Sequence, residues 1–242
     1  MLKQIAAACI TAAVLSSCST LQAVSDKIFP SDKSTLTMAD VVPVMRPATP
    51  RVRQQQQKFV KENLKRFSSG KAAGAHYVTE AKRNFNDEKP DSAAYLFGRA
   101  WLLDSTNNDI FWGYGLVYGQ QKQFDKSLFI LYKAHKADKE NPRLLTDIAT
   151  SHLGRFYEAS SPDDLLKSRK LLEEAIKLAP DEEDAYYKLA ISCYYLQDYP
   201  KAWEYLHKSL RQDKAIADKK FISALLAKHR DPEGIYHHRN IQ

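Results

Sequence analysis

A pattern of residue sizes that recurs along the chain constrains its fold more than any other sequence feature. A small residue is followed four positions later by a large apolar residue, and three positions beyond that by another small one. The steps between the four sets are 34, 41 and 34 residues. Spacings of three and four place such side chains on one face of a helix, so we predict four similar helical units in an all-α chain. The sets are Ala93, Phe97 and Ala100; Ser127, Leu131 and Ala134; Ser168, Leu172 and Ala175; and Ala202, Leu206 and Ser209.

A second pattern in the earlier half of each unit locates an insertion. In two units the last residue of this pattern, Tyr118 or Cys193, stands nine positions before the first small residue of the later pattern. In the unit between them, His152 stands sixteen positions before it. We therefore expect a seven-residue insertion, placed in a loop over residues 154–164. This loop is either a tolerated surface insertion or a second contact for a partner, since loops often carry function. The earlier pattern comprises Phe111, Tyr114, Gly115 and Tyr118; Leu145, Ile148, Ala149 and His152; and Tyr186, Leu189, Ala190 and Cys193.

Four such units in phase resemble the tetratricopeptide repeat, which combines W-x₂-L-G-x₂-Y with A-x₃-F and a closing proline over 34 residues. Gly115, Ala149 and Ala190 occupy the position where a small residue lets two antiparallel helices approach, and Pro180 closes one unit. The resemblance implies a superhelix of stacked helix-turn-helix units that offers a binding surface. We expect units at 74–107, 108–141, 142–182 and 183–216, together 74–216, then a closing helix at 217–230 and a C-terminal tail at 231–242.

The resemblance also implies which helices would hold a partner. In tetratricopeptide proteins the first helix of each unit usually lines the concave face, and here its outward positions are aromatic or aliphatic. They lack the Lys, Asn and Arg set that clamps a C-terminal carboxylate, so we expect an apolar or aromatic peptide segment or a partner's helix. The alternative is that these residues pack between repeats. The predicted protein-binding groove comprises Val78, Phe85, Trp112, Leu116, Thr146, Thr150, Tyr187, Ile191, Tyr194 and Tyr195.

The N-terminus has the pattern of a bacterial lipoprotein signal. Lys3 precedes an uncharged run over 5–15 that is too short for a permanent membrane span. The run ends in the sequence L-S-S-C, which resembles the lipobox and implies removal of a signal peptide 1–17 and lipid attachment at Cys18. Ser19 in place of aspartate favours the outer membrane. The alternative is a secretory signal that stands beside a cysteine by chance.

A spacer and a basic helix are expected before the repeats. Residues 18–50 contain four prolines among Ser, Thr and Asp without any sustained period, which predicts a flexible tether. Apolar residues at helical spacing then predict a basic amphipathic helix at 51–73. Residues 41–75 carry eight cations and one anion. The net charge of this segment is therefore +7, which equals the formal net charge of the whole chain.

The cations of this segment have two interpretations. They are either the solvated face of a helix that caps the fold or a basic surface that contacts anionic head groups or an acidic partner. Nucleic acid is a poor partner for an exported chain. The residues of the predicted basic surface are Arg51, Arg53, Lys58, Lys61, Lys65 and Arg66.

The sequence shows no pattern that predicts catalysis, a cofactor or a metal site. The glycines of 113–119 lack the spacing of a dinucleotide-binding loop, and the adjacent histidines at 237–238 face apart without supporting ligands. Cys193 is interpreted as a buried small apolar residue, because the other two cysteines belong to the signal and the anchor. We therefore expect neither an enzyme nor a small-molecule substrate.

The leading hypothesis is a lipid-anchored adaptor of an outer-membrane or periplasmic assembly, such as pilus, β-barrel or cell-wall machinery. Its partner would be another envelope protein or a peptide segment, with the membrane contacted through the lipid anchor. The alternative is a protein that binds a membrane or cell-wall surface through the basic segment 41–75. A hydrolase with a site that no motif reveals is a third hypothesis.

Overall fold

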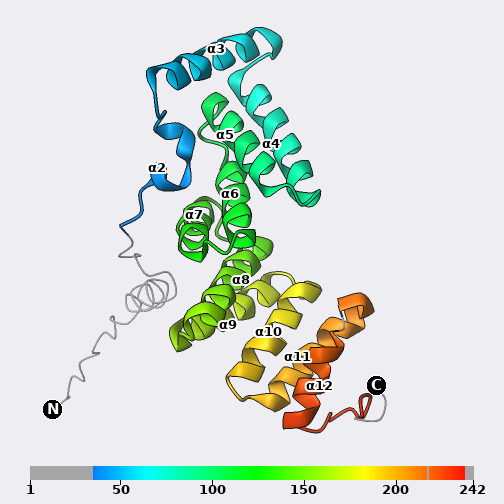
Figure 1. The fold of residues 1–242 in the computed structure, drawn as a ribbon. Coiled ribbons are helices and arrows are strands. Elements are labelled where there is room, and N and C mark those ends of the chain that lie inside the picture. The colour runs from blue at the N-terminus through cyan, green and yellow to red at the C-terminus, as the bar shows by residue number, and fades with distance from the viewer. Residues whose placement is uncertain (1–34, 217, 238–242) are drawn as a thin grey trace, which may run out of the picture. The chain divides into compact units, whose positions relative to one another are not determined.

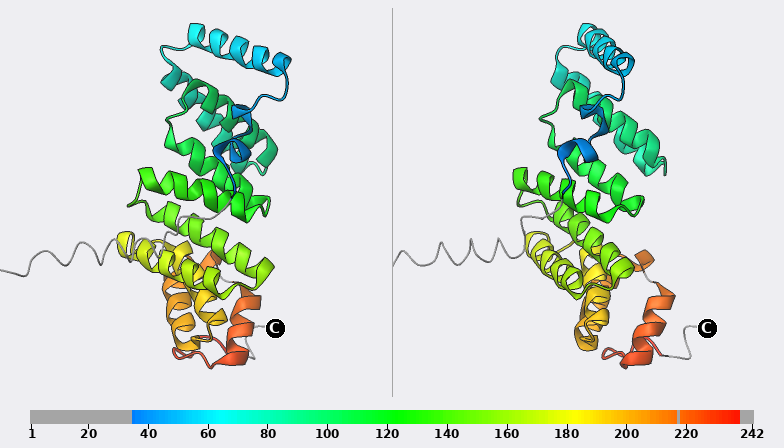
Figure 2. Two further views of the ribbon diagram at one scale, coloured as in Figure 1. Left: turned by 90° about the vertical axis from the view of Figure 1, so that its left-hand side faces the viewer. Right: turned by 60° about the vertical axis from the view of Figure 1, so that its left-hand side comes forward.

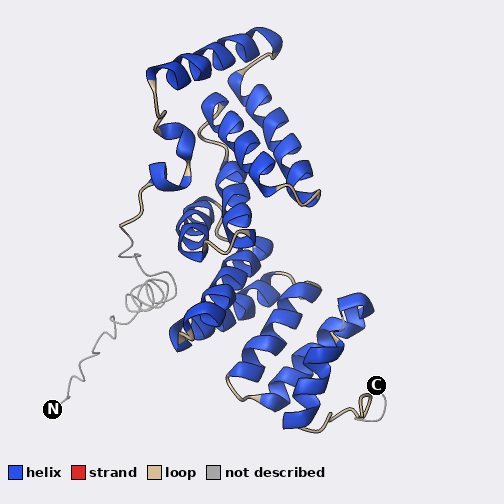
Figure 3. Cartoon of the chain, viewed as in Figure 1, coloured by secondary structure: helices blue, strands red, loops and turns tan. Residues whose placement is uncertain are grey.

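The computed structural model describes residues 35–216 and 218–237 of the 242-residue chain. These residues form helices and connecting turns and contain no strand (Figure 1, Figure 3). Within the same residues, no helix combines the length and the apolar character needed to cross a membrane. The predicted signal peptide, Cys18 and the first part of the predicted tether lie outside the described residues.

Residues 70–212 form four helical hairpins that stack in chain order. In each hairpin the first helix packs against the second, and the second packs against the first helix of the next hairpin (Figure 1). The first helices also contact one another along the stack. The pairs are α4 (Gly70–Asn86) with α5 (Pro90–Leu103), α6 (Asn108–Gln120) with α7 (Phe124–Ala137), α8 (Pro142–Ala159) with α9 (Pro162–Leu178), and α10 (Glu183–Tyr195) with α11 (Tyr199–Gln212).

Three of the four hairpins close with the same turn. Glu88, Lys122 and Gln197 each follow a first helix and adopt a left-handed backbone conformation with φ of 58°, 58° and 62°. The amide of the following residue then donates to a carbonyl of the last helical turn, as from Gln123 to Tyr118 at 2.9 Å. This is the Schellman arrangement, which satisfies carbonyls at a helix end and usually uses glycine at the left-handed position. A non-glycine residue there carries backbone strain of about 1–2 kcal/mol.

Glycines allow the hairpins to approach closely. A Cβ atom on Gly113 would overlap the ring of Phe97 in the preceding hairpin, and one on Gly115 would overlap Leu131 in the same hairpin. The carbonyl of Gly115 also accepts a hydrogen bond of 2.8 Å from the Ser127 hydroxyl. The sequence predicted this close approach at Gly115 from its place in the repeat.

The seven-residue insertion lengthens two helices instead of forming the loop predicted over 154–164. Helix α8 runs on to Ala159, and α9 begins at Pro162, so two serines alone connect them. The helical extension is held by Asp164, which accepts hydrogen bonds from Arg155 at 2.7 to 3.0 Å. The prediction of a loop was wrong, because the ion pair between Arg155 and Asp164 joins the two helices and the repeat period gives no sign of this contact.

Part of the predicted tether is folded. Helix α2 (Met38–Val41) and the 3₁₀ helix η1 (Pro43–Met45) pack against α7 and α5 (Figure 2). Val41 and Val42 are fully buried, and the Tyr118 hydroxyl donates a 3.0 Å hydrogen bond to the Val41 carbonyl. We call residues 38–45 the N-terminal strap. The prediction of a flexible tether is wrong for these residues, because apolar burial against the second helices orders them.

The basic helix is shorter than predicted. Helix α3 spans Pro50–Arg66, begins at a cap in which the Thr49 hydroxyl accepts from the Val52 amide, and is followed by α4 from Gly70. Residues 70–73 therefore belong to the first hairpin. The Ser69 hydroxyl accepts a hydrogen bond of 3.1 Å from the Ala72 amide and caps α4 there, which explains the earlier end of the basic helix.

The C-terminal residues close the stack. After η2 (Lys214–Ile216), α12 (Lys219–Lys228) covers α11. The predicted tail is folded up to residue 237, because the buried carboxylate of Asp231 accepts from His207 Nε2 at 2.7 Å and from the Tyr236 amide at 2.9 Å. The Tyr236 ring stacks on Trp203 at a centroid distance of 6.2 Å. These contacts hold the segment against α11.

Candidate functional site

The predicted groove residues all lie on the first helices α4, α6, α8 and α10, but their exposure differs. Val78 and Thr146 keep only 4% and 2% of their surface exposed. The prediction that they line an open groove is therefore wrong, since packing against neighbouring helices covers them. Thr150 is exposed, and its hydroxyl donates a 2.8 Å hydrogen bond to the Thr146 carbonyl. Half-buried side chains occupy the remaining positions outside the last hairpin, which are Phe85, Trp112 and Leu116.

Polar contacts join neighbouring first helices. The Trp112 indole Nε1 of α6 donates a 2.6 Å hydrogen bond to the carboxylate of Asp147 on α8, and Lys82 of α4 pairs with Asp109 of α6 at 2.9 Å. Burial raises the pKa of Asp147 to about 6 despite the hydrogen bond from Trp112, which favours the charged form. Trp112 therefore links two hairpins, as the alternative of packing between repeats implied.

Aromatic rings from α8, α10 and α12 meet beside the last hairpin. Phe156 and Tyr157, on the lengthened end of α8, lie 5.1 and 5.5 Å between centroids from Tyr195 of α10. Tyr194 lies 5.3 Å from Tyr195 and 5.7 Å from Phe221 of α12. These pairs have the edge-on geometry that favours attraction between aromatic rings. Tyr187 of α10 lies 5.8 Å from the same Phe221 ring. We define the aromatic cluster as Phe156, Tyr157, Tyr187, Tyr194, Tyr195 and Phe221.

The aromatic cluster remains open to solvent at one end. Tyr157 and Tyr195 are 53% and 44% exposed, whereas Tyr187, Tyr194 and Ile191 are half-buried. Partial burial, together with the neighbouring Tyr195, raises the pKa of Tyr157 further above its ordinary value. Like that of any tyrosine, its hydroxyl is protonated at neutral pH and can donate a hydrogen bond. Large, rigid rings with a polar tip supply contact area at a low cost in side-chain entropy.

The sequence identified only part of this cluster. Tyr187, Tyr194 and Tyr195 were predicted groove residues, and the structure brings them together. Phe156 and Tyr157 were assigned to the inserted loop, and nothing in the repeat pattern connected them to Tyr195. The adjacent aromatic pair within an insertion was the one available signal, because an insertion that carries large apolar side chains must cover them against another element.

A buried polar network surrounds His152 of α8. His152 Nδ1 is 2.6 Å from Asp164, and its Nε2 is 2.7 Å from the Tyr132 hydroxyl. Burial alone would raise the pKa of Asp164, but hydrogen bonds from His152 and Arg155 outweigh it and hold that pKa well below its usual range. His152 is only 2% exposed, so this set of residues serves to join α8 to α9.

The remaining thiol of the described residues is enclosed. Cys193 is fully buried in the core of the last hairpin, and this burial raises the pKa of its thiol to about 11. A thiol with such a pKa is protonated at neutral pH and is a poor nucleophile. No group of three or more metal-binding side chains occurs within the residues that the structure describes. The predicted lipid-attachment residue Cys18 lies outside them.

The predicted basic surface lies on α3 and is exposed. Lys58 is 3.8 Å from Glu62, one turn further along α3, and Arg66 stands 6.0 Å from the centre of the Phe67 ring. The other four predicted cations form no ion pair with the residues that the structure describes; they are Arg51, Arg53, Lys61 and Lys65.

Comparison with known protein families gives no match, and no curated protein matches the sequence. Solved structures do match. A thermophilic TPR protein of Thermus thermophilus superposes with a TM-score of 0.55 at 12% identity, over 64% of this chain and 80% of that one. PilF of Pseudomonas aeruginosa gives 0.54 at 17% identity, over 69% and 79% of the two chains. A MamA segment of Desulfovibrio magneticus gives 0.51 at 16% identity, over 75% and 100%.

These similarities concern the fold, because the identities are too low to carry a function between the proteins. They agree with the four stacked hairpins and with the repeat period of the sequence, and they confirm the predicted fold class. The chain has the tetratricopeptide-repeat fold, a stack of helix-turn-helix units (TPR).

Proposed function

We propose that this chain is a lipid-anchored adaptor of the bacterial cell envelope and that it holds a segment of another protein on its first helices. The exposed aromatic cluster carries this proposal. Tyrosine is enriched at protein interfaces, and a few large aromatic side chains usually supply most of the binding energy. The ligand that fits is an apolar or aromatic peptide segment or a partner's helix. Adaptors of this kind bind without catalysing a reaction.

The envelope location rests on the sequence L-S-S-C, which ends at Cys18. Two or three acyl chains on such a cysteine would hold a protein stably at a membrane, whereas one chain holds it only reversibly. An outer-membrane or periplasmic assembly of a pilus, β-barrel or cell-wall machine would supply the partner. PilF of Pseudomonas aeruginosa has the same fold, and at 17% identity this similarity concerns the fold alone.

Replacing the two exposed tyrosines tests the binding surface. The Tyr157→Ala/Tyr195→Ala variant is expected to recover at least tenfold less of its partner when the tagged chain is purified from crosslinked envelopes and quantified by mass spectrometry. Tyr95→Ala is the matched control, since Tyr95 on α5 is 60% exposed but lies outside the cluster. Equal recovery with the double variant and the parent would contradict the proposal, provided that both show the same unfolding temperature.

Replacing the anchor residue tests the location. A Cys18→Ala chain is expected to lose incorporation of labelled palmitate and to move from the membrane fraction to the soluble fraction. Cys193→Ala is the control. Because the Cys193 thiol is buried, we expect this variant to leave both readouts unchanged. A Cys18→Ala chain that stays membrane-bound as firmly as the parent would refute the anchor while leaving the binding surface open to the first experiment.

A further inference from the structure

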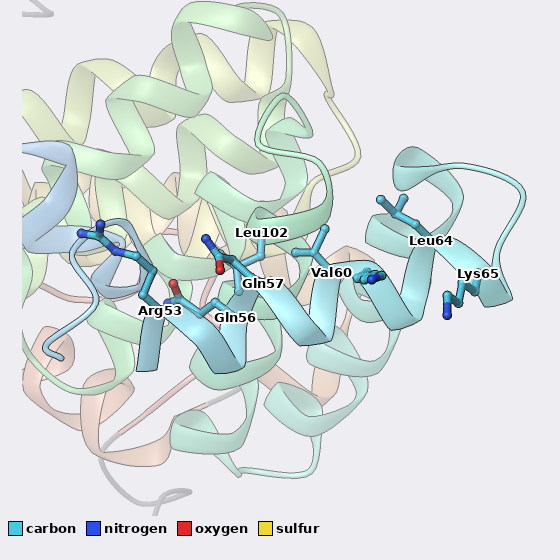
Figure 4. A pocket seen from close by; sticks show the side chains of 8 residues that line it. Arg53, Gln56, Gln57, Val60, Leu64, Lys65 and Leu102 are labelled. Atoms are coloured by element: carbon cyan, nitrogen blue, oxygen red, sulfur yellow. The ribbon is translucent and has the colours of Figure 1, made fainter. Parts of the chain in front are cut away.

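Helix α3 presents a second surface that is independent of the first helices. One face of α3 and Leu102 of α5 line a pocket of about 490 Å³ (Figure 4). The α3 residues follow one another at helical spacing, so they form a single stripe along the helix. We define the α3 stripe as Arg53, Gln56, Gln57, Val60, Lys61, Leu64 and Lys65.

A different face of α3 attaches this helix to the repeats. The Phe59 ring lies 5.2 Å from the ring of Tyr77, and the Arg99 guanidinium stands 4.2 Å above its centre. The Tyr77 hydroxyl donates a 3.1 Å hydrogen bond to the buried side chain of Asn63. Phe59 and Asn63 thus attach α3 to the repeats. Of the α3 stripe, Gln56 donates a 3.2 Å hydrogen bond to the Val44 carbonyl of the N-terminal strap, whereas Leu64 and the cations Arg53, Lys61 and Lys65 remain exposed.

The α3 stripe combines apolar and positive groups. Val60 is half-buried and Leu64 is 50% exposed, and both line the pocket together with Leu102. Arg53, Lys61 and Lys65 border these apolar side chains, and no carboxylate lines the pocket. Exposed cations beside apolar contacts attract a partner that carries the complementary pattern of carboxylates beside apolar side chains.

We propose that the pocket between α3 and α5 binds an acidic amphipathic helix of a partner protein. Apolar side chains of that helix would contact Val60, Leu64 and Leu102, and its flanking Asp and Glu residues would pair with the cations of the α3 stripe. Helix α3 has 17 residues and is about 25 Å long, so it can accompany a partner helix of about four turns.

The shape and composition of the surface favour a helix over a lipid bilayer. A helix lying on a membrane needs a broad apolar face, often with Trp, Phe or Leu, that sinks below the head groups. The α3 stripe offers only Val60 and Leu64, and the largest apolar side chain of α3, Phe59, is already packed against Tyr77 and Arg99. A recess between two helices also admits a third helix more readily than a flat surface.

Binding of a synthetic peptide tests the proposal. The probe is a fluorescent helix of about 18 residues, with leucines along one face and glutamates on both flanks, measured by anisotropy against the purified full chain. We expect saturable binding that weakens several-fold between about 50 and 300 mM salt, because screening shortens the range of the charge interactions. A peptide of the same composition in scrambled order is expected to bind at least tenfold more weakly.

Two charge-reversal variants on the same helix locate the contact. Lys61→Glu/Lys65→Glu is expected to lower the affinity for the peptide at least tenfold. Arg51→Glu/Lys58→Glu makes the same change in net charge outside the α3 stripe and is expected to alter the affinity less than threefold. Methyl chemical-shift changes at Leu64 and Leu102 of the unmodified chain provide a readout that does not depend on any variant folding.

The remaining outcomes would overturn the proposal. They are the absence of saturable binding to the ordered peptide, equal binding of the scrambled peptide, and equal losses in the two charge-reversal variants. Vesicles that contain anionic phosphatidylglycerol are the final comparison. If they bind the chain through Lys61 and Lys65 while the ordered peptide does not bind, the surface recognises lipid and not a protein helix.

Discussion

The carboxylate of Asp147 on α8 accepts a 2.6 Å hydrogen bond from the indole of Trp112 on α6, and it lies in a setting that disfavours its charge. Burial raises its pKa from 3.8 to about 6. The folded chain therefore holds this proton more tightly than the unfolded chain does. The resulting stabilisation is fully present below about pH 4 and is lost as the pH rises through about 6.

We predict that Asp147→Asn stabilises the chain at neutral pH. The amide keeps an acceptor for Trp112 but cannot ionise. A pKa difference of this size corresponds to about 3 kcal/mol, and we expect about 1–2 kcal/mol because Asp147 keeps part of its surface in water. Urea unfolding should show this gain near pH 7.5 and almost none near pH 4. A gain of the same size at both pH values would contradict the assignment of the effect to this carboxyl.

Two glycines of α6 are predicted to respond to alanine in opposite directions. A Cβ on Gly113 would overlap the ring of Phe97, so Gly113→Ala should cost about 1–3 kcal/mol through overpacking. A Cβ on Gly119 meets nothing closer than the Ser127 Oγ at 3.5 Å, so Gly119→Ala should gain up to about 1 kcal/mol from helix propensity. Thermal unfolding of the two variants measures the difference. Similar shifts in both would count against the close packing at Gly113.

Relief of a strained turn is predicted to stabilise the second hairpin. Lys122 connects α6 to α7 with a φ of 58°, a conformation that glycine adopts without strain. Lys122→Gly should therefore raise the free energy of unfolding by about 0.5–1 kcal/mol. Lys133→Gly, an exposed site within α7, should lower it by about 1 kcal/mol. Denaturant unfolding of the two variants gives both values, and a loss at Lys122 would exclude the left-handed turn.

We predict that the free energy of unfolding depends strongly on Asp164, whose ion pair with Arg155 holds the insertion. Asp164→Asn removes the charge that Arg155 and His152 face, and it should cost about 2–3 kcal/mol, less than for a fully enclosed pair because Arg155 is partly exposed. Since the folded chain lowers the pKa of Asp164, its contribution is present above about pH 4 and is lost as the pH falls further.

The neighbouring residue provides the control for this prediction. Asp163 is exposed at the start of α9, and Asp163→Asn should change stability by less than about 1 kcal/mol through the helix dipole alone. Denaturant unfolding at neutral pH compares the two variants. If both cost the same, the network around Asp164 does not stabilise the extended α8.

The repeat period predicts the hairpins because each unit must bury the same face against its neighbours. Spacings of three and four residues identify that face, and small residues such as Gly115 mark where helices approach. The period cannot predict the course of an insertion, since it describes only what the units share. The extension of α8 to Ala159 depends on the contact of Asp164 with Arg155, and no other unit has an arginine at the position of Arg155.

Burial of the N-terminal strap was equally beyond the reach of the sequence. Val41 and Val42 stand among prolines without any period, and their burial depends on a complementary site on the repeats. Gly98 of α5 belongs to that site, because a Cβ there would lie 2.8 Å from Val44. Such complementarity between distant segments leaves no local pattern.

Part of the candidate site could likewise be predicted from the sequence, and part of it could not. Tyr187, Tyr194 and Tyr195 could be found because they occupy the outward positions of a repeat helix. Tyr157 could not, since its contact with Tyr195 exists only because α8 is longer than its counterparts. The pocket beside α3 also needs Leu102, and no pattern in the sequence places this residue near Val60 and Leu64.

The attachment of the N-terminal strap has a mechanical consequence. A pull from the N-terminal side would reach the folded repeats first at Val41 and Val42, which are buried beside the second helices α5 and α7. The load would therefore enter the repeats through that contact with α5 and α7, and not through the first helix of the first hairpin. Helix α3, although it follows the strap in sequence, would bear no tension until Val41 and Val42 had detached.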